Sequence, residues 1–280
     1  MAIILAGGPV AAVRKEAIRS EAAAGDRAPK LAIILAGDDA ASRVYSQRLQ
    51  KLGETVGIDV ALTQLPQTVS EPEVLTVIDR LNSDPGVDSI LPMMPMPPQI
   101  SAAAVAARLS HLKDVDSLNP LNAGLVATGK SRWAPCTPRA VMAILDYYRI
   151  PLAGRQAVIV GRSNVVGKPL AQLLLAADAT VTVCHSKTAD LAQVIGRGDI
   201  VIAAVGRPQL IQAAMVKPGA VVIDVGINDT PAGLVGDVDF ASVEPVAAAI
   251  TPVPGGVGTV STVMVMEAVL NQKKRGRLAC

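Results

Sequence analysis

Aromatic residues are scarce in this chain, and their scarcity excludes one class of function. The 280 residues include three tyrosines, one phenylalanine and one tryptophan, and the formal net charge is only +2. A nucleic-acid-binding surface needs clustered basic side chains, usually with aromatic rings among them. We therefore expect no nucleic-acid partner.

Cysteine and long apolar runs are also lacking. Cys136, Cys184 and Cys280 do not have the spacing of a metal-ligand set, and three thiols cannot all pair. No apolar run reaches the ~18 residues of a membrane span, and Arg14 and Lys15 interrupt the segment where a signal peptide would be apolar. We expect a cytoplasmic protein with no bound metal, no disulfide framework and no membrane partner.

What the chain does contain is an alternation of helix-like and strand-like segments. In the first half, helices are expected at 10–24, 42–57 and 71–82, and strands at 31–36, 58–62 and 89–91. In the second half, a helix from Pro138 to about Tyr148, with Thr137 as its N-cap, precedes strands at 158–160, 180–184, 200–205, 221–225 and 234–235. This alternation predicts parallel sheets. The chain is long enough for two modest α/β domains.

The most informative segment is residues 158–169, in which a β-branched run breaks at a glycine and a helical pattern follows. Gly161 allows a tight turn after the strand, and Gly167 allows the next helix to pack closely on that turn. The helix N-terminus would then face an anion, and Arg162 offers a guanidinium fork that suits a phosphate. The pattern departs from Gly-x-Gly-x-x-Gly and resembles many strand-to-helix loops, so alone it only suggests a nucleotide site.

The end of the expected strand at 180–184, which its apolar residues predict to be buried, indicates which nucleotide would bind. His185, Ser186 and Lys187 follow it, at the place where doubly wound folds contact the adenosine ribose. NAD enzymes usually have an acidic residue there, whereas a hydroxyl and a cation suit a 2′-phosphate. NADP is therefore the expected cofactor. A polar loop without a ligand is the alternative interpretation.

A third informative segment is residues 251–258, Thr-Pro-Val-Pro-Gly-Gly-Val-Gly. Its prolines and glycines predict a loop that is rigid at first and then bends freely, followed by a helix from about Ser261 to Lys273. The apolar face of that helix is expected to pack on the first domain through Val263, Met266, Val269 and Leu270.

Taken in order, these segments and several others resemble one known family. The blocks that carry the resemblance are 37–45, 113–116, 135–138, 160–169, 184–188, 224–228 and 251–258. They are similar in order and residue type to blocks of the bifunctional methylenetetrahydrofolate dehydrogenase/methenyltetrahydrofolate cyclohydrolase family, the FolD proteins. The resemblance covers nearly the whole chain.

The resemblance implies an α/β fold of two αβ domains with a cleft between them for folate and nicotinamide. It places a catalytic, folate-binding domain at 1–137 and 261–280, an NADP-binding Rossmann domain with a parallel sheet at 138–260, and a homodimer formed through the Rossmann domains. Tyr45 and Asp116 are the catalytic candidates, and both would also bind substrate. The other substrate-binding candidates are Leu49, Pro92, Met93, Met94, Pro254, Gly255, Gly256 and Val257. The cofactor-binding candidates are Gly161, Arg162, Ser163, Val166, Gly167, His185, Ser186 and Ile227.

Two departures from the family pattern bear on activity. The family has a catalytic lysine four residues after the tyrosine that Tyr45 matches, and Leu49 stands there in this chain. The family also has a glutamine beside that lysine, where Met93 stands. Lys51 would face away from the site on a helix, and Arg48 cannot act as a base because its guanidinium stays protonated.

Each candidate also has a purely structural interpretation. Tyr45 could be a core or interface aromatic, and Asp116 could cap a turn through Asn119. Met93, Met94 and Met96 could simply fill space, or their pliable thioethers could line a pocket for a ligand of altered shape. Arg48 could hold the glutamate tail of a folate or could point to water.

The two reactions of the family make different demands on the protein. Oxidation of the methylene bridge is a hydride transfer that needs aligned rings and a favourable field, whereas hydrolysis of the resulting cation needs a general acid/base. We therefore expect NADP-dependent oxidation of 5,10-methylenetetrahydrofolate to 5,10-methenyltetrahydrofolate, with hydrolysis to 10-formyltetrahydrofolate weak or lost. The alternatives are a paralogue that oxidises a different methylene or imine pterin, and a non-catalytic dimer that binds NADP.

Overall fold

The computed structural model describes residues 1–130, 133–231 and 233–278. The chain forms two compact units. The larger unit comprises residues 1–12 and 126–261, and the smaller unit comprises residues 13–125 together with the chain from residue 262 onward. The boundaries fall within helices α1 (Gly7–Ala23), α5 (Pro120–Ala127) and α10 (Val257–Leu278), so each of these helices contributes to both units.

A three-stranded parallel sheet forms the centre of the smaller unit. Its strands lie in the order β3 (Asp59–Leu65), β2 (Lys30–Ala36) and β4 (Ser89–Pro92). Every residue of β2 after Lys30 is buried, which explains why its sequence is a continuous apolar run rather than an alternating one. Because the strands are parallel, their carboxyl ends meet at one edge of the sheet.

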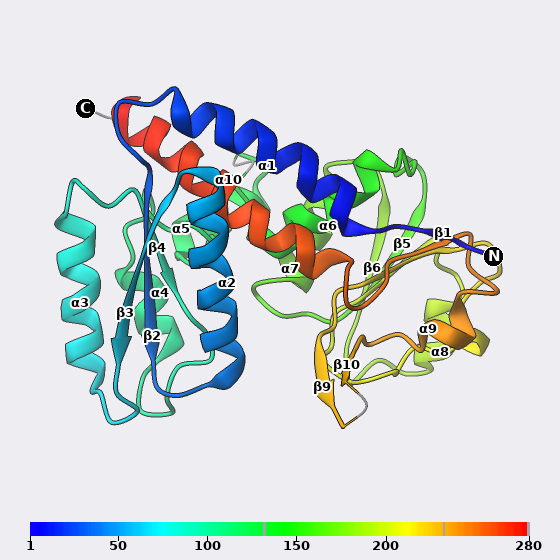
Figure 1. The fold of residues 1–280 in the computed structure, drawn as a ribbon. Coiled ribbons are helices and arrows are strands. Elements are labelled where there is room, and N and C mark those ends of the chain that lie inside the picture. Colours follow the sequence, from blue (N-terminus) through cyan, green and yellow to red (C-terminus); the bar gives the residue numbers. More distant parts are fainter. Residues whose placement is uncertain (131–132, 232, 279–280) are drawn as a thin grey trace. The chain divides into compact units, whose positions relative to one another are not determined.

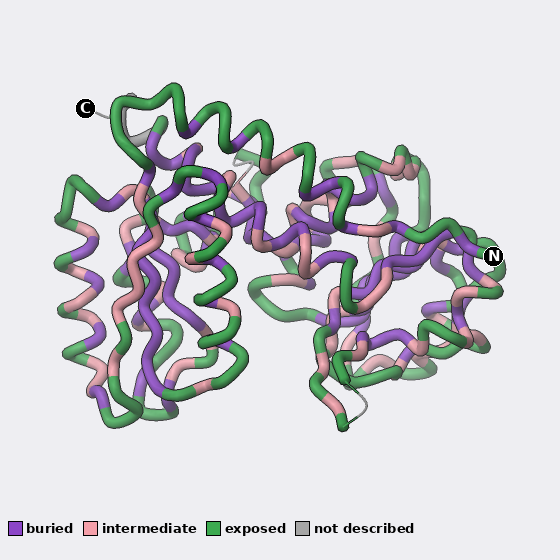
Figure 2. Tube along the Cα trace, in the orientation of Figure 1, coloured by how far each residue is buried: buried purple, intermediate pink, exposed green. Residues whose placement is uncertain are grey.

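Helices cover both faces of this sheet (Figure 1). On one face lie α3 (Glu71–Ser83) and α4 (Ala102–Arg108), whose buried side chains join those of β2 in one core cluster. On the other face lies α2 (Ala40–Val56). The buried side of α2 consists of Ser42, Ser46, Leu49, Gly53 and Val56. Figure 2 shows buried strands at the centre and helices whose outer sides are exposed.

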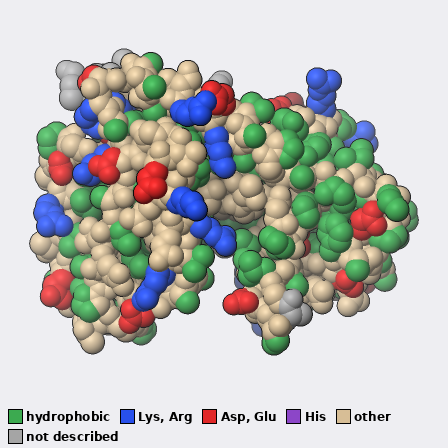
Figure 3. Space-filling model, in the orientation of Figure 1, with side chains coloured by type: hydrophobic (Ala, Val, Ile, Leu, Met, Phe, Trp, Pro, Cys, Tyr) green, Lys and Arg blue, Asp and Glu red, His purple; other side chains and the backbone are tan. Residues whose placement is uncertain are grey.

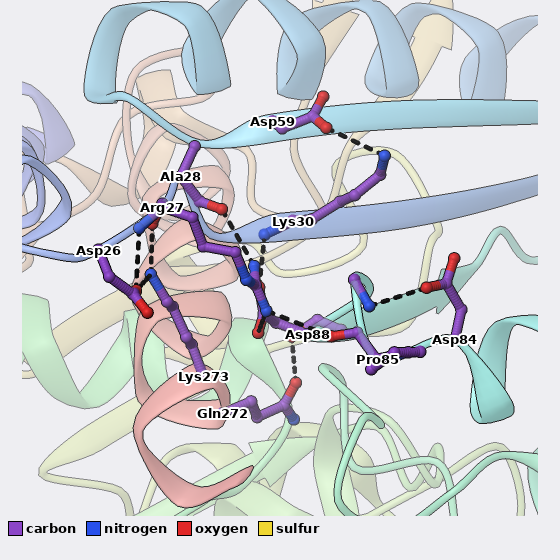
Figure 4. Close-up of polar contacts among 12 residues, drawn as sticks. Asp26, Arg27, Ala28, Lys30, Asp59, Asp84, Pro85, Asp88, Gln272 and Lys273 are labelled. Atoms are coloured by element: carbon purple, nitrogen blue, oxygen red, sulfur yellow. Dashed lines mark hydrogen bonds and ion pairs between the residues drawn. The ribbon is translucent and has the colours of Figure 1, made fainter. Parts of the chain in front are cut away.

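Polar contacts tie the end of α10 to the smaller unit (Figure 4). Lys273 donates from its ammonium to the carbonyl oxygen of Arg27, in the segment before β2. Gln272 accepts from the hydroxyl of Ser89 in β4 and donates from Nε2 to the carbonyl oxygen of Asp114 at 2.6 Å. The last turns of the helix are therefore held by the same segments that form the sheet.

The helix α10 starts earlier and is buried more widely than the sequence predicts. It begins at Val257 rather than near Ser261. The four residues expected on its apolar face, Val263, Met266, Val269 and Leu270, are buried. Met264 and Val265 are buried as well, so the apolar surface extends beyond a single face.

A six-stranded parallel sheet forms the centre of the larger unit. The order of its strands is β1 (Ile3–Ile4), β11 (Ala249–Ile250), β8 (Val221–Asp224), β7 (Ile200–Ala203), β5 (Gln156–Val160) and β6 (Thr180–Cys184). The other elements of this part of the chain are α5 (Pro120–Ala127), α6 (Cys136–Tyr147), α7 (Gly167–Leu175), α8 (Leu191–Ile195), the short 3₁₀ turn Ala213–Met215 and α9 (Phe240–Val243). Since β6 pairs with one side of β5 and β7 with the other, the strand order reverses at β5. Open parallel sheets bind ligands outside the carboxyl ends of the strands at such a reversal.

Three expectations for this unit are wrong in detail. The strand at 234–235 belongs to β10 (Gly233–Val235), which pairs antiparallel with β9 (Asn228–Thr230) outside the parallel sheet. The N-cap of α6 is Pro135 rather than Thr137, because Pro138 is tolerated anywhere in a first turn, where N–H groups have no intrahelical partner. The strand β6 lies at the sheet edge and is mostly not buried.

The sequence analysis missed β1 and β11, because a two-residue strand shows no periodicity. These strands pair in parallel through Ile3 with Ala249 and Ile4 with Ile250. The pairing brings the first residues of the chain into the sheet of the larger unit. The spatial units therefore group residues 1–12 with that sheet, whereas the assignment of 1–137 to a catalytic domain is a statement about function and stays a prediction.

Several observations limit the chemistry of the described residues. Cys136 and Cys184 are buried and form no disulfide, and Cys280 lies outside the described residues. Within the part of the chain that the structure describes, no group of three or more His, Cys, Asp or Glu side chains could hold a metal ion. None of the described helices is both long and apolar enough to cross a membrane. Basic and acidic side chains are interspersed on the face drawn in Figure 3.

Candidate functional site

The candidates of the smaller unit lie on segments that follow or flank the strands of its parallel sheet. Tyr45 and Leu49 lie on α2, which follows β2, and Met93 directly follows β4. Asp116 lies two residues beyond Asp114, which forms a parallel bridge with β4. Three separate segments therefore carry the candidates away from the edge at which parallel sheets bind ligands.

Hydrogen bonds connect the start of α2 to the segment after β4. Ser42 donates from Oγ to the carbonyl oxygen of Met94 at 3.4 Å, and Ser46 donates from Oγ to the carbonyl oxygen of Ser42 at 2.6 Å. The backbone N–H of Met93 donates to the carbonyl oxygen of Ile34 in β2 at 2.8 Å. These contacts hold the backbone at 93–94 beside the first turns of α2.

The candidates at positions 49 and 93 are buried apolar side chains. Leu49 is fully buried, Met93 is 7% exposed and Tyr45 is half-buried. Arg48 and Lys51, the cations nearest to Leu49 in the sequence, are exposed. Neither cation occupies the place of a buried base next to Tyr45.

The neighbouring residues after β4 have a packing role. Pro92 is buried, and Met94 and Met96 are half-buried and pack against the core cluster that β2 shares with α3 and α4. This packing agrees with the space-filling interpretation, and the substrate-binding role of Met94 stays a prediction.

Asp114, which the sequence analysis did not single out, is the centre of a polar network beside Asp116. Its carboxylate is 2% exposed and accepts the backbone N–H groups of Leu118 at 3.0 Å and Asn119 at 2.8 Å, and the side-chain amide of Asn122 at 2.8 Å. Burial raises the pKa of Asp114 above its ordinary value, although these donors act in the opposite direction. The backbone N–H of Asn119 therefore donates to the carboxylate of Asp114, whereas the structural interpretation assigned this capping contact to Asp116. An aspartate before a polar turn is a capping signal that could have identified Asp114.

In the larger unit, the turn after β5 has the geometry expected of a phosphate loop. Gly161 has φ +133°, and a Cβ there would clash with the carbonyl oxygen of Ala204, just beyond β7. A Cβ at Gly167 would clash with the carbonyl oxygen of Gly161, so α7 starts directly against the turn. Ser163 accepts through Oγ from the N–H of Val166 at 3.1 Å. Glycines at 161 and 167 therefore bring the turn and the helix start together, as a bound pyrophosphate requires.

The polar residues after β6 form a second turn at the same edge of the sheet. The backbone N–H of His185 donates to Oγ1 of Thr188 at 2.8 Å, and its ring Nδ1 accepts from the N–H of Lys187 at 3.1 Å. Ser186 is exposed, as is Arg162 in the turn after β5. The turn after β6, residues 185–188, presents hydroxyl and cationic groups and contains no acidic residue, so its chemistry fits a phosphate.

Two further carboxylates, Asp224 and Asp237, were not identified from the sequence. They are 3% and 0% exposed, and Asp224 ends β8. Burial raises the pKa of Asp224 to about 6, and nearby Asp237 raises it too, although backbone N–H groups that donate to Asp224 lower it. A carboxylate at the end of a buried parallel strand was the available signal.

The loop at 251–258 leads from β11 into α10. Gly7 donates from its N–H to the carbonyl oxygen of Gly255 at 2.7 Å, which holds the loop against the start of α1. Its four candidate residues are Pro254 and Gly255, which are exposed, and Gly256 and Val257, which are buried. Ile227 is 60% exposed, and a Cβ at Gly258 would lie 3.2 Å from Cδ1 of Ile227. The structure thus places Ile227 beside the start of α10.

The candidates form two groups, one on each unit. The cofactor candidates and the loop at 251–258 belong to the larger unit. The remaining substrate candidates belong to the smaller unit. The cleft expected between the two domains stays a prediction.

Matches to family models cover most of the chain. Residues 5–116 match the model described as the tetrahydrofolate dehydrogenase/cyclohydrolase catalytic domain, and residues 135–277 match the NAD(P)-binding domain of the same family. The bifunctional protein FolD of Halalkalibacterium halodurans is 46% identical over 276 residues, which cover 98% of this chain and 99% of that protein.

Solved structures of two similar proteins have the same fold. The bifunctional FolD enzyme of Campylobacter jejuni has a TM-score of 0.96 and 38% sequence identity, with coverage of 99% of this chain and 100% of that one. FolD of Trypanosoma brucei, solved with NADP cofactor and an inhibitor, has a TM-score of 0.94 and 34% identity, with coverage of 99% and 98%.

Proposed function

The chain belongs to the tetrahydrofolate dehydrogenase/cyclohydrolase family, and on that premise we propose that it oxidises 5,10-methylenetetrahydrofolate to 5,10-methenyltetrahydrofolate with NADP and hydrolyses the product weakly or not at all. Both the catalytic and the NAD(P)-binding domains of the family are present. The observation that carries the proposal is the burial of two apolar side chains, Leu49 and Met93, at the positions where the family has lysine and glutamine.

Oxidation requires alignment rather than a titrating side chain. A hydride leaves the methylene carbon between N5 and N10, and the product is a cation delocalised over those two nitrogens. NADP, when bound, supplies the hydride acceptor. Tyr45 is half-buried on α2 and can pack on a folate ring, and the carboxylate of Asp116 can stabilise the cation. Asp114 supports Asp116 by accepting its backbone N–H.

Hydrolysis of the methenyl cation makes a different demand. A water molecule must lose a proton as its oxygen attacks the bridge carbon, and a folate nitrogen must gain a proton as the carbon–nitrogen bond breaks. Leu49 and Met93 offer no titratable group, and Arg48 and Lys51 are exposed. General acid–base catalysis contributes roughly 10²–10⁴-fold. The methenyl product should therefore leave the protein before it is hydrolysed there.

NADP rather than NAD is the proposed cofactor. Arg162 and Ser186 are exposed at the carboxyl ends of β5 and β6, and the turn after β6 contains no acidic residue. A guanidinium and a hydroxyl stabilise a 2′-phosphate, whereas the acidic residue usual in NAD enzymes would repel it. The NADP in the structure of the Trypanosoma brucei relative supports this choice.

We also infer a homodimer in a reducing compartment such as the cytoplasm. The edge strand β6 exposes Val183 to 37%, and α7 exposes Leu175 to 50%. An edge strand with exposed apolar side chains is a typical pairing surface. The buried Cys136 and Cys184, which form no disulfide, fit a reducing environment. Sedimentation equilibrium of the purified protein tests the dimer.

The oxidation assay tests the proposed function. Purified protein is given 5,10-methylenetetrahydrofolate with NADP or NAD, and formation of the reduced cofactor is followed. The proposal predicts higher kcat/KM with NADP, whereas equal or higher kcat/KM with NAD would overturn the cofactor assignment. Tight NADP binding without oxidation of this folate would favour the alternatives, a different methylene or imine pterin as substrate or a non-catalytic dimer.

A further inference from the structure

The two buried carboxylates of Asp224 and Asp237 hold three segments together at the carboxyl edge of the larger sheet: the loop after β7, the loop after β8 and the end of the β9–β10 hairpin. Asp224 ends β8, and Asp237 follows that hairpin. The backbone N–H of Asp224 also donates to Oγ1 of the buried Thr251, in the loop after β11, at 2.7 Å. The segments that meet at the two aspartates are therefore far apart in the sequence.

Asp237 holds the loop after β7. Its Oδ2 accepts the backbone N–H groups of Val205 at 2.6 Å and Gly206 at 3.0 Å, and its Oδ1 accepts the N–H of Arg207 at 2.9 Å. The side-chain amide of Asn228, at the start of β9, also donates to Oδ1, at 3.0 Å. A single carboxylate thus fixes three consecutive backbone amides of one loop and one side chain of another.

Asp224 holds the loop after β8 and the end of the hairpin. Its Oδ1 accepts the N–H groups of Gly226 at 2.9 Å and Asp237 at 3.0 Å, and its Oδ2 accepts the N–H of Val238 at 2.9 Å. The two aspartates are linked in series, because Asp224 fixes the backbone of Asp237, whose side chain fixes the loop after β7.

Glycines make room for both carboxylates. A Cβ at Gly226 would clash with the carboxylate of Asp237, and a Cβ at Gly236 would clash with that of Asp224. Each loop therefore approaches the carboxylate of the other more closely than a side chain would allow. The arrangement is specific to acceptor oxygens, since an amide nitrogen in place of either oxygen would point N–H against N–H.

The position of these loops relative to the reversal of strand order indicates what they serve. A dinucleotide lies across such a reversal, here at β5, with its pyrophosphate over the glycine turn. If the adenosine half lies toward β6, where His185 and Ser186 end the strand, the nicotinamide half lies toward β7 and β8. The loops that Asp224 and Asp237 fix are those that follow β7 and β8.

We propose that Asp224 and Asp237 are positioning residues for the nicotinamide half of the cofactor, which they align through the loops after β7 and β8. The inference rests on the proposed function, because it takes the NAD(P)-binding domain to carry a dinucleotide in the manner described. Neither carboxylate needs to touch the cofactor. Their effect on hydride transfer passes through the backbone at 205–207 and 225–228.

The test compares a whole cofactor with its adenosine half. Dissociation constants for NADPH and for 2′,5′-ADP are measured by calorimetry for the wild type, Asp237→Asn and Asp239→Asn. Asp239 is a matched control, because it caps α9 by accepting the N–H of Ser242 at 3.4 Å and lies two residues from Asp237. For Asp237→Asn we expect NADPH to bind about tenfold more weakly, with 2′,5′-ADP affinity within about twofold of the wild type. Asp239→Asn should change neither.

Activity provides a second measurement. In Asp237→Asn, kcat for oxidation should fall on the order of 100-fold, because small misplacements of reacting groups have effects of that size, while KM for the folate stays within about threefold. Equal loss of NADPH and 2′,5′-ADP affinity, or no loss of NADPH affinity, would overturn the proposal. If Asp237→Asn does not fold, the same two ligands are tested with Asn228→Ala. This variant should bind NADPH about threefold more weakly and should bind 2′,5′-ADP as the wild type does, and the same two outcomes would overturn the proposal.

Failure of the proposed function would be recognised separately. A wild type that binds NADPH but does not oxidise 5,10-methylenetetrahydrofolate refutes the substrate and leaves the binding comparison intact. A wild type that prefers NAD refutes the cofactor choice, and the comparison is then made with NADH and ADP-ribose, with the same expected difference between Asp237→Asn and Asp239→Asn.

Discussion

The carboxyl edges of the two parallel sheets differ in chemistry. At the edge of the larger sheet, turn glycines bring the backbone of a phosphate loop together, and Asp224 and Asp237 fix the neighbouring loops through N–H groups. At the edge of the smaller sheet, Leu49 and Met93 are buried where the family has a polar pair. Under the proposed function, the chain keeps the residues that position a cofactor and lacks the group that would transfer a proton.

The smaller unit also contains a buried polar network around Asp114. Asp114 is buried, and its carboxylate accepts the backbone N–H groups of Leu118 and Asn119 in the turn after Asp116. Gln272 of α10 donates to the carbonyl oxygen of Asp114. The backbone that presents Asp116 is therefore supported, as an electrostatic role in oxidation requires. The apolar positions are Leu49 and Met93, on which the proposed loss of hydrolysis rests.

Restoring the polar pair should have the largest effect. Leu49→Lys with Met93→Gln is expected to raise hydrolysis of 5,10-methenyltetrahydrofolate by on the order of 10²-fold or more, measured by loss of methenyl absorbance above the uncatalysed rate. Leu49→Lys alone should do less, because a buried lysine without a partner is destabilised by desolvation. A single variant as active as the double variant would show that the glutamine is unnecessary.

A pH-dependent difference in stability tests the buried carboxylates of the larger unit. The pKa of Asp224 is about 6 in the folded protein and about 3.9 in an unfolded chain, so the folded state holds an extra proton between those values. The resulting stabilisation is present below pH 4 and is lost as the pH rises through 6, by up to about 3 kcal/mol. The unfolding free energy of the wild type minus that of Asp224→Asn should therefore be larger at pH 4 than at pH 7. Urea denaturation that shows the reverse would contradict this picture of the network.

The free energy of NADP binding should change by an amount comparable to, or smaller than, that pH-dependent change in stability. Arg162→Ala is expected to weaken NADP binding by roughly 1.5–3 kcal/mol, the range for a hydrogen bond to a charged group, and to leave NAD binding nearly unchanged. Lys168→Ala is the matched control, since this exposed cation of the same loop bonds Asn164 at 2.7 Å. Calorimetric titration with both nucleotides gives the values. Equal losses for NADP and NAD would mean that Arg162 does not contact the 2′-phosphate.

Removing an exposed cation near Leu49 should have the smallest effect. Lys51 is exposed on α2, so Lys51→Ala should alter the rates of oxidation and hydrolysis by no more than about twofold. Initial rates of both reactions with saturating substrate measure this. A large fall in hydrolysis would indicate that Lys51 had taken over the proton transfer.

Much of the fold could be predicted from the sequence, because buried parallel strands leave long apolar runs. The strand β2 and the turn from β5 into α7 are examples, and both lie where the pattern indicated. The strands β1 and β11 could not be predicted, since each has two residues and is defined by its partner. The strand at 234–235 was predicted as part of the parallel sheet, because strand propensity does not specify the pairing partner, which is β9.

Residues of the candidate site could be predicted only where their role depends on neighbours a few residues away in the sequence. Gly161 and Gly167 are required by a turn and a helix start a few residues apart, so their spacing gave the signal. Asp237 accepts N–H groups from a loop about 30 residues earlier in the chain, and no local pattern records such a partner. The polar networks around Asp114 and around Asp224 and Asp237 therefore could not be predicted from the sequence.

The most direct test of the central claim follows both reactions in one cuvette. Wild-type protein is mixed with 5,10-methylenetetrahydrofolate and NADP, and the reduced cofactor and the methenyl product are measured separately with time. We expect the methenyl product to accumulate together with NADPH and then to decay at the rate seen without protein. Methenyl product that never accumulates, or purified methenyl substrate consumed as fast as oxidation proceeds, would show that a group other than a residue at position 49 or 93 performs the proton transfer.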